Sequence, residues 1–115
     1  MDYTKSFERY LQVEKGRAAR TIHGYLSDVR RFRSWLDENP VKGITLSWEE
    51  VKARHIRAYL TSLEASPTYV HRIISSLRGW FGYLQEVEEL TESNPATELS
   101  KPKLRDKRVP STYFE

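Results

Sequence analysis

Apolar residues recur every three or four positions along most of this chain, which is the spacing of a buried helix face. The pattern predicts four helical segments, over residues 3–14, 18–37, 47–63 and 67–89. No segment keeps the strict alternation of apolar and polar residues that a half-buried strand requires. The sequence therefore predicts an all-α fold without a sheet.

Several of these segments carry signals for where a helix begins or ends. Ser66 can cap the fourth segment, and Pro67 suits its first helical position. Ser47 and Glu50 fit a capping box at the start of the third segment. A break between that first turn and the main third helix stays open as an alternative. Gly16 suits a helix stop after the first segment.

The apolar stripes also define the expected core. We expect these residues to be buried together: Ile22, Tyr25, Val29, Phe32, Leu36, Ile56, Leu60, Ile74, Leu77, Phe81 and Leu84. Hydrophobic residues make up 38% of the 115, which suffices for one modest core. We therefore expect one folded domain over residues 1–99 and a basic, proline-marked segment over residues 100–115. Its prolines predict an extended and flexible strap rather than a helix.

The fourth segment has a second face of unusual composition. It carries short hydroxyls, small residues and isolated cations, where an ordinary solvated face would carry mixed Lys and Glu pairs. Its members are Thr68, His71, Arg72, Ser75, Ser76 and Arg78, followed by Gly79 and Gly82. The glycines suit either a close helix crossing or a close approach of DNA. A face of this kind suits a large anionic partner, and such a helix can enter the major groove of DNA.

The net charge of +3 is only mildly basic, so the distribution of charge is more informative than its sum. The last fifteen residues hold five Lys or Arg against two Asp or Glu, whereas acids gather over residues 86–92. A second basic cluster lies within one turn and consists of Arg30, Arg31 and Arg33. This cluster fits either a DNA contact or a solvated face paired with Asp28 and Asp37. Arg78 fits either DNA or an acid within the protein.

Some functional classes are disfavoured. The absence of cysteine excludes disulfides and thiolate metal sites and fits a reducing cytoplasm. No apolar run approaches the length of a membrane span, and the charged N-terminal residues are unlike a signal peptide. The three histidines do not stand at helical ligand spacings with a third ligand nearby. We therefore expect a cytoplasmic protein without a metal or cofactor.

The order of the segments carries a family resemblance. The chain reads FERYL, EKGRAARTIHGYLSDVRRFRSWL, HIRAYLTSL, SPTYVHRIISSLRGWFGYL and NPATELSKPKLRDKRVP. The pattern Arg72-x-x-Ser75-x-Leu77-Arg78 and the run from Asn94-Pro95 to Val109-Pro110 are its most specific parts. In this order and spacing, essentially the whole chain resembles the N-terminal core-binding domain of tyrosine site-specific recombinases, the phage-integrase and Xer-like family. One departure is Ala18, where the family usually places a serine that caps the second helix.

The resemblance implies a four-helix SAM-like core-binding domain whose second and fourth helices cross and lie against the major groove of double-stranded DNA. It implies contacts with other recombinase protomers on DNA through the first helix, and we expect the isolated domain to be a monomer. The family's catalytic Arg, Lys, His and Tyr residues lie in a domain that follows this one. We therefore expect this chain to be a non-enzymatic part of a longer recombinase, with Tyr113 not acting as the nucleophile.

The expected DNA contacts lie at two helix starts, on the second face of the fourth segment and in the basic strap. They are Arg20, Thr21, Arg31, Thr68, His71, Arg72, Ser75, Ser76, Lys101 and Lys103. Free backbone N–H groups at a helix start favour phosphate near Arg20 and Thr21. Two other functions stay open: a stand-alone DNA-binding regulator of helix-turn-helix type, and a protein-interaction module that uses the first helix and the Glu-rich end.

Overall fold

The computed structural model of this chain describes residues 2–102. Four α-helices are present: α1 (Thr4–Arg9), α2 (Ala19–Glu38), α3 (Ala53–Leu63) and α4 (Pro67–Glu86). Three shorter turns accompany them: the π-helical η1 (Tyr10–Glu14) and the 3-10 helices η2 (Trp48–Glu50) and η3 (Pro95–Glu98). Residues 2–102 contain no strand beyond one isolated bridge between Val41 and Ile44. The all-α prediction is confirmed.

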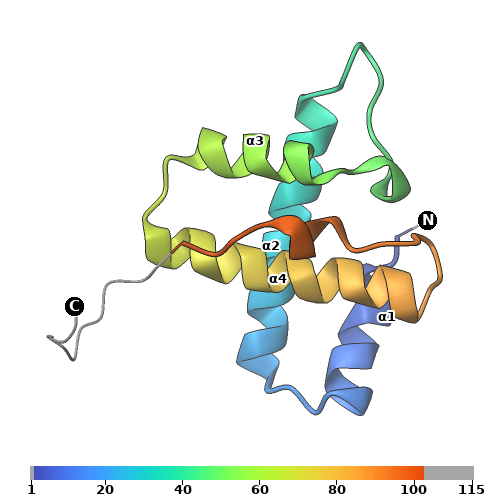
Figure 1. Cartoon of the computed structure of the whole chain (residues 1–115). Coiled ribbons are helices and arrows are strands. Elements are labelled where there is room, and N and C mark those ends of the chain that lie inside the picture. Colours follow the sequence, from blue (N-terminus) through green and yellow to red (C-terminus); the bar gives the residue numbers. More distant parts are fainter. Residues whose placement is uncertain (1, 103–115) are drawn as a thin grey trace, which may run out of the picture.

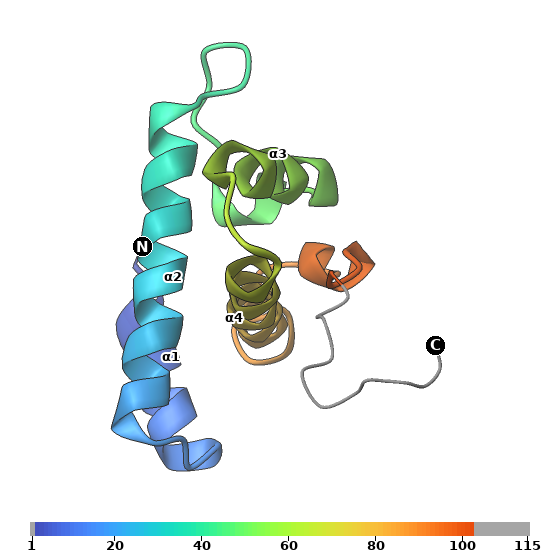
Figure 2. The same cartoon turned by 90° about the vertical axis from the view of Figure 1, so that its left-hand side faces the viewer.

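The helices are arranged in layers around a crossing of the two longest ones. Figure 1 shows α2 running steeply behind α4, with α1 beside the first half of α2. Figure 1 shows α3 and α4 running in opposite directions across the view. In Figure 2, where α4 is seen end-on, η3 covers the side of α4 away from α2. The expected crossing of the second and fourth helices is therefore confirmed.

The core fills the space between these layers. Trp80 is fully buried, with its ring centroid 5.1 Å from that of Phe7 in α1 and 5.1 Å from that of Trp48 in η2. This aromatic cluster joins three elements that lie far apart in the sequence. Among the expected core residues, Tyr25 and Leu60 are only half-buried, and the others are buried.

The first and fourth helices are each followed by a left-handed residue; the first stops at the expected Gly16, and the fourth ends earlier than expected. The first helix changes to π-helical geometry at Tyr10, and Gly16 then adopts a left-handed φ of 60° that ends it. Helix α4 ends at Glu86 rather than at Glu89. Glu89 itself is left-handed, and the Leu90 N–H closes the helix end on the Leu84 carbonyl. In both cases a left-handed residue turns the chain away from the helix axis.

Other signals are confirmed. The Ser66 hydroxyl accepts a hydrogen bond from the Tyr69 N–H at the start of α4. The capping box of Ser47 and Glu50 is present, but it belongs to the short η2 turn. Helix α3 begins only at Ala53, so the alternative with a break is the correct one.

The segment after α4 folds back along that helix. Residues 95–98, which belong to the expected domain of residues 1–99 but were assigned no element, form the 3-10 helix η3. The Asn94 carboxamide caps this turn at the Ala96 N–H and also donates to the Arg78 carbonyl. Ser100–Pro102 continue without helix, while residues 103–115, including Lys103, lie outside the described part of the chain.

Both glycines of α4 face other parts of the protein. A Cβ at Gly79 would stand 3.6 Å from the ring of Tyr25, and one at Gly82 would stand 3.4 Å from the Asn94 amide nitrogen. At these distances a Cβ would make ordinary van der Waals contact, so packing does not require glycine at either position and both alternatives stay open.

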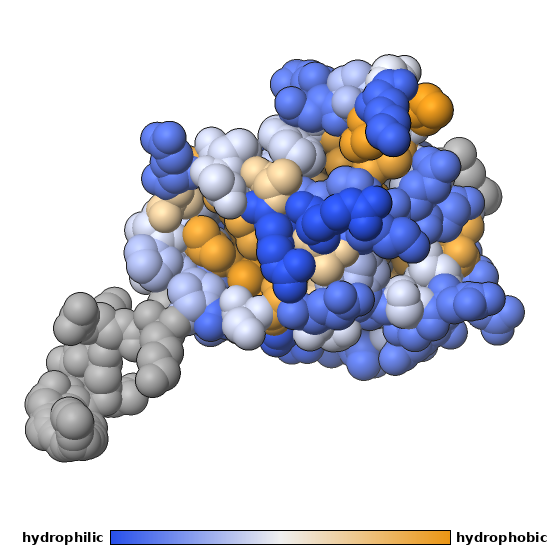
Figure 3. All heavy atoms as spheres, turned by 45° about the horizontal axis from the view of Figure 1, so that its top comes forward, coloured by the Kyte–Doolittle hydropathy of each residue, from blue (hydrophilic) through white to orange (hydrophobic). Residues whose placement is uncertain are grey.

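Hydrophilic residues predominate on the face shown in Figure 3, where hydrophobic patches are separated by them. Among residues 2–102, the large hydrophobic residues that are exposed are Val13, Val41, Ile44 and Val87. Within residues 2–102, no helix combines the length and the apolar character needed to cross a bilayer.

Candidate nucleic-acid interface

The start of α2 presents unpaired backbone donors at the surface. Its N-cap residue is Ala18, and no side chain in the described part of the chain caps it. The first N–H that bonds back into the helix is that of Ile22, which donates to the Ala18 carbonyl at 3.0 Å. Arg20 and Thr21 are exposed beside these donors. A helix start of this kind, with a cation next to it, attracts a phosphate.

A groove opens where the first half of α4 passes α2, and we call it the crossing groove. Its volume is about 490 Å³, and its lining residues are Tyr25, Ser66, Thr68, Tyr69, His71, Arg72 and Ser75. All but Tyr25 come from the N-terminal half of α4 or its cap. The lining therefore combines hydroxyls, two aromatic rings, an imidazole and one guanidinium, and it contains no carboxylate.

A buried carboxylate lies beneath this groove. Asp28 of α2 is 1% exposed and accepts hydrogen bonds from three donors on α4. The Arg72 Nη2 donates to Oδ1 at 2.5 Å, and Nε donates to Oδ2 at 3.2 Å. The Ser76 hydroxyl donates to Oδ2 at 2.6 Å. The hydrogen bonds with Asp28 raise the pKa of the Arg72 guanidinium above its ordinary value, so the guanidinium stays charged.

Tyr69 links the ion pair to the surface of α2. The Arg72 guanidinium carbon lies 5.1 Å from the centroid of the Tyr69 ring. The Tyr69 hydroxyl accepts a hydrogen bond from the Arg31 Nη1 at 3.0 Å. Arg72 therefore lies over the Tyr69 ring while Arg31 binds its hydroxyl, and the groups from α2 and α4 form a single connected network.

The expected site residues fall into three groups. Arg20, Thr21, Arg31, Thr68 and Arg72 are exposed, whereas His71 and Ser75 are partly buried at the groove. Ser76 is fully buried beneath Asp28, so in this conformation it lies behind the surface on which it was expected. Lys101 folds back onto α4, where its Nζ donates to the Ser75 hydroxyl at 2.6 Å. Lys103 lies outside residues 2–102.

Arg33 and Arg78 have different surroundings. Arg33 pairs with Asp37 at 2.9 Å, which confirms that part of the solvated-face alternative. The expected second partner, Asp28, instead binds Arg72. Arg78 binds no acid among the described residues: its Nη2 donates to the Leu99 carbonyl at 2.6 Å and its Nε to the Ala96 carbonyl at 3.4 Å.

Sequence reasoning missed three residues of this site. Tyr25 had been assigned to the core, but it lies at the edge of the apolar stripe and lines the groove. Tyr69 follows the cap of α4 and was not considered. Asp28 was assigned to the wrong arginines. The available signal was its position directly before the core residue Val29, because a charge at the border of a buried stripe needs a partner.

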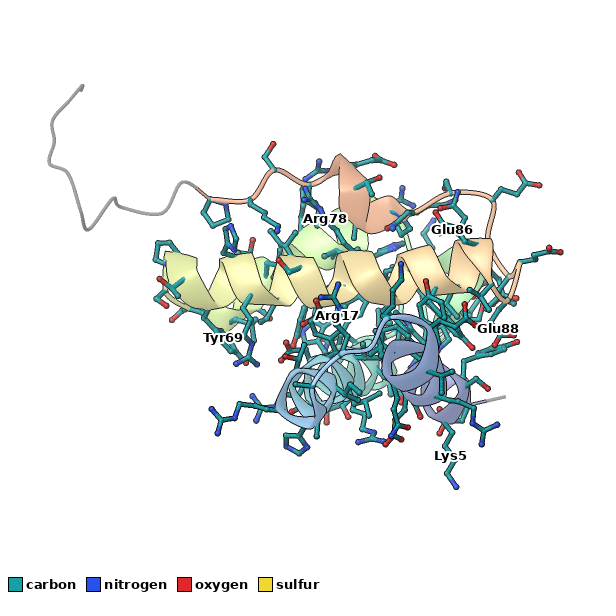
Figure 4. All side chains as sticks on the ribbon, turned by 90° about the horizontal axis from the view of Figure 1, so that it is seen from below. Lys5, Arg17, Tyr69, Arg78, Glu86 and Glu88 are labelled. Atoms are coloured by element: carbon teal, nitrogen blue, oxygen red, sulfur yellow. The ribbon has the colours of Figure 1, made fainter. Side chains whose placement is uncertain are left out.

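Charge is distributed unevenly along α4. Figure 4 shows Tyr69 near one end of the helix, Glu86 and Glu88 near the other, and Arg78 on the side that faces η3. Glu86 and Glu89 are exposed, whereas Glu88 is half-buried and accepts a hydrogen bond from the Tyr83 hydroxyl. The acidic end is therefore distant from the crossing groove along the helix.

A larger hollow lies between α3 and the segment around η3. Its volume is about 610 Å³, and its charged lining residues are Lys52, Arg54, Arg57, Glu49, Glu92 and Glu98. Because three cations face three carboxylates, this hollow is less suited to a polyanion than the crossing groove. Residues 2–102 also contain no group of three His, Cys, Asp or Glu side chains placed to hold a metal ion.

Comparison with known proteins gives one family and a consistent set of relatives. Residues 4–87 match the family model described as phage integrase, N-terminal SAM-like domain. The chain is 31% identical over 113 residues to the tyrosine recombinase XerC of Syntrophus aciditrophicus, an alignment that covers 93% of this chain and 36% of that protein. It is 36% identical over 110 residues to the XerC of Leptospira interrogans serovar Lai, an alignment that covers 95% of this chain and 34% of that protein.

A solved structure shows the same fold. The integrase from mycobacterium phage Brujita superposes with a TM-score of 0.70 over 93% of this chain and 34% of its own, at 24% sequence identity. This likeness supports the four-helix arrangement. The chain spans about a third of the length of the curated relatives that it matches.

Proposed function

Because this chain belongs to the family of phage integrase N-terminal SAM-like domains, matched over residues 4–87, we propose that it binds duplex DNA as part of a tyrosine recombinase. In this proposal residues 1–99 are the DNA-binding domain, and residues 100–115 lead toward a catalytic domain that breaks and rejoins strands. The length of the relatives supports this division, since the matched part is about a third of each.

The observation that carries the proposal is the crossing groove. It is free of carboxylates at its surface, and it lies beside the start of α2, where Arg20 and the free N–H groups can bind phosphate. Hydroxyls, an imidazole and Arg72 line it and can reach base edges. The acidic end of α4 would repel a duplex, which favours binding at the opposite end of that helix.

The connection between α3 and α4 and their relative direction bear on the alternative of a helix-turn-helix regulator. Only residues 64–66 join these helices, a length that such a motif also uses. The two helices of that motif cross at roughly 90–120°, whereas α3 and α4 run in opposite directions across the view of Figure 1. The geometry therefore favours the crossed pair α2 and α4 as the DNA-binding element.

The contact between protomers through the first helix remains part of the proposal. Val13, on the π-helical turn that follows α1, is 71% exposed, and an apolar side chain so placed can pack against another copy on DNA. Through this contact the chain would also act as a protein-interaction module, so that alternative becomes a second role of the same chain.

Binding to labelled DNA as a function of salt tests the proposal. We expect the chain to bind a labelled duplex more tightly than a single strand, in the range of about 10⁻⁴ to 10⁻⁶ M that is typical of non-specific complexes. Arg20→Ala should weaken binding to all duplexes about equally and lower the salt slope by about 0.9. Glu86→Ala is the matched control, because Glu86 is exposed at the far end of α4. Equal binding to both forms of DNA, or an unchanged slope in Arg20→Ala, would contradict the proposal.

A further inference from the structure

The Asp28–Arg72 pair is buried at one end and exposed at the other. The Asp28 side chain is 1% exposed, whereas the Arg72 side chain is 53% exposed. The carboxylate holds the guanidinium along one side, through Nε and one N–H of Nη2. The opposite, outer end of the guanidinium therefore faces the crossing groove, where Arg72 is one of the lining residues.

The donors that Asp28 leaves free form a defined pattern. A guanidinium has five N–H donors, and Asp28 uses one on Nε and one on Nη2. The three that remain include one on Nη1 and one on Nη2 that point in the same direction. Two parallel donors match two neighbouring acceptors, and in the major groove guanine offers these as O6 and N7. Adenine places a donor beside its N7, so it matches poorly.

The charge of the pair argues for base reading rather than phosphate binding. A guanidinium already paired with a buried carboxylate adds little net positive charge to the surface. Its attraction for phosphate is therefore weaker than that of Arg20, for which the structure shows no acidic partner among residues 2–102. What remains is directional hydrogen bonding, which depends on where the donors point.

The orientation of Arg72 is fixed on two sides. Asp28 holds its edge, and the Tyr69 ring lies 5.1 Å from its central carbon. Ser76 in turn holds Asp28 through Oδ2. A side chain that is held before binding loses less conformational entropy when it binds. The network therefore prepares the outer donors of Arg72 for a partner that enters the groove.

We propose that Arg72 recognises a guanine in the major groove and that Asp28 is the positioning residue that presents it. This inference rests on the proposed duplex binding and adds to it the base that is read and the residue that orients the reader. A purely structural role, in which Arg72 only neutralises Asp28, would leave sequence preference unchanged when either residue is replaced conservatively.

Selection from a duplex pool tests the inference. The probe is a pool of duplexes with a randomised central stretch, which is sequenced after binding to the 115-residue chain and its variants. We expect the unmodified chain to prefer guanine at one position by roughly 5- to 150-fold, the range that one bidentate contact provides. Arg72→Lys keeps the charge but loses the fixed pair of parallel donors, so this preference should be reduced, since an ammonium can still donate to guanine. Asp28→Asn should also reduce this preference.

A charge-matched double variant separates base reading from charge. Asp28→Asn combined with Arg72→Gln keeps the net charge and leaves an amide pair in place of the ion pair. We expect its salt slope to equal that of the unmodified chain while its guanine preference is lost, with thermal unfolding confirming that it is folded. A slope lowered by about 0.9, with all sequences weakened alike, would assign Arg72 to phosphate and overturn the inference.

The unmodified chain and Arg72→Lys together decide the inference. Duplex binding without a guanine preference, or a preference that is undiminished in Arg72→Lys, would overturn this inference and leave the proposed function intact. Absence of any duplex binding would overturn both.

Discussion

Asp28 is a charged side chain in an otherwise apolar core, and its hydrogen bonds make that position possible. A carboxylate taken out of water loses several kcal/mol of solvation, which only close donors can offset. Arg72 and Ser76 supply three such bonds from the neighbouring helix. The pairing spans 44 residues of sequence, so helical periodicity could place each residue near a face but could not predict that they meet.

Replacing Ser76 tests whether its hydroxyl is structural. Ser76→Ala should lower the free energy of unfolding by about 1–3 kcal/mol, because it removes a buried donor to a charged group. Urea unfolding measures this change. Ser75→Ala is the matched control, since Ser75 lies partly exposed at the groove and contacts Lys101, and it should cost less. Equal costs at the two positions would contradict the network.

Two buried tyrosines predict how stability depends on pH. Burial raises the pKa of Tyr59 to about 12. The pKa of Tyr83 is also raised to about 12, mainly by burial and to a smaller extent by the hydrogen bond with Glu88. An unfolded tyrosine has a pKa of about 10. The folded state therefore favours the neutral phenol, and this contribution is complete below pH 10 and is lost as the pH rises toward 12.

Tyr59→Phe isolates this effect, because the ring still packs on Phe32 and Trp35 while the ionising hydroxyl is gone. We expect its free energy of unfolding to fall less between pH 10 and 12 than that of the unmodified chain. Urea titrations across that range provide the measurement. Parallel pH profiles for the two proteins would show that Tyr59 ionises as readily in the folded state as in the unfolded one.

The helices show which features of an element follow from the sequence. The four apolar stripes predicted the four α-helices because burial of one face is what stabilises each helix. The crossing of the second and fourth helices was implied by the family resemblance. Their ends were less predictable. Glu89 adopts the left-handed conformation usually taken by glycine, and the π-helical turn at Tyr10 has no signal in the spacing of apolar residues. Such ends depend on tertiary contacts that the periodicity does not contain.

Arg78 connects α4 to η3, although it was considered for DNA or an acidic partner. Its guanidinium donates to the carbonyls of Ala96 and Leu99, which lie at the start and end of that turn. Arg78→Ala should therefore loosen η3 and speed hydrogen exchange at the Leu99 amide, which bonds within the turn. Exposed Arg9 of α1 provides the matched control. Exchange at Leu99 that is unchanged in Arg78→Ala would contradict this role.

The whole molecule separates its charges more than its net charge of +3 suggests. The crossing groove and the start of α2 carry cations and hydroxyls, whereas the far end of α4 carries exposed carboxylates. This separation would orient a duplex even though the overall attraction is small. Composition alone could not predict this separation of charge, because the net charge contains no information on which helix ends lie close together in the fold.

Titration of an unlabelled duplex into the isotopically labelled chain, followed through backbone amide shifts, tests the central claim most directly. We expect the largest changes at Arg20, Thr21, Thr68, Arg72 and Ser75, with Glu86 and Glu89 little affected. Raising the salt concentration should reverse the changes. Shifts confined to α1, to residues 86–92 or to residues 103–115, with the crossing groove silent, would contradict the assignment of this surface to DNA.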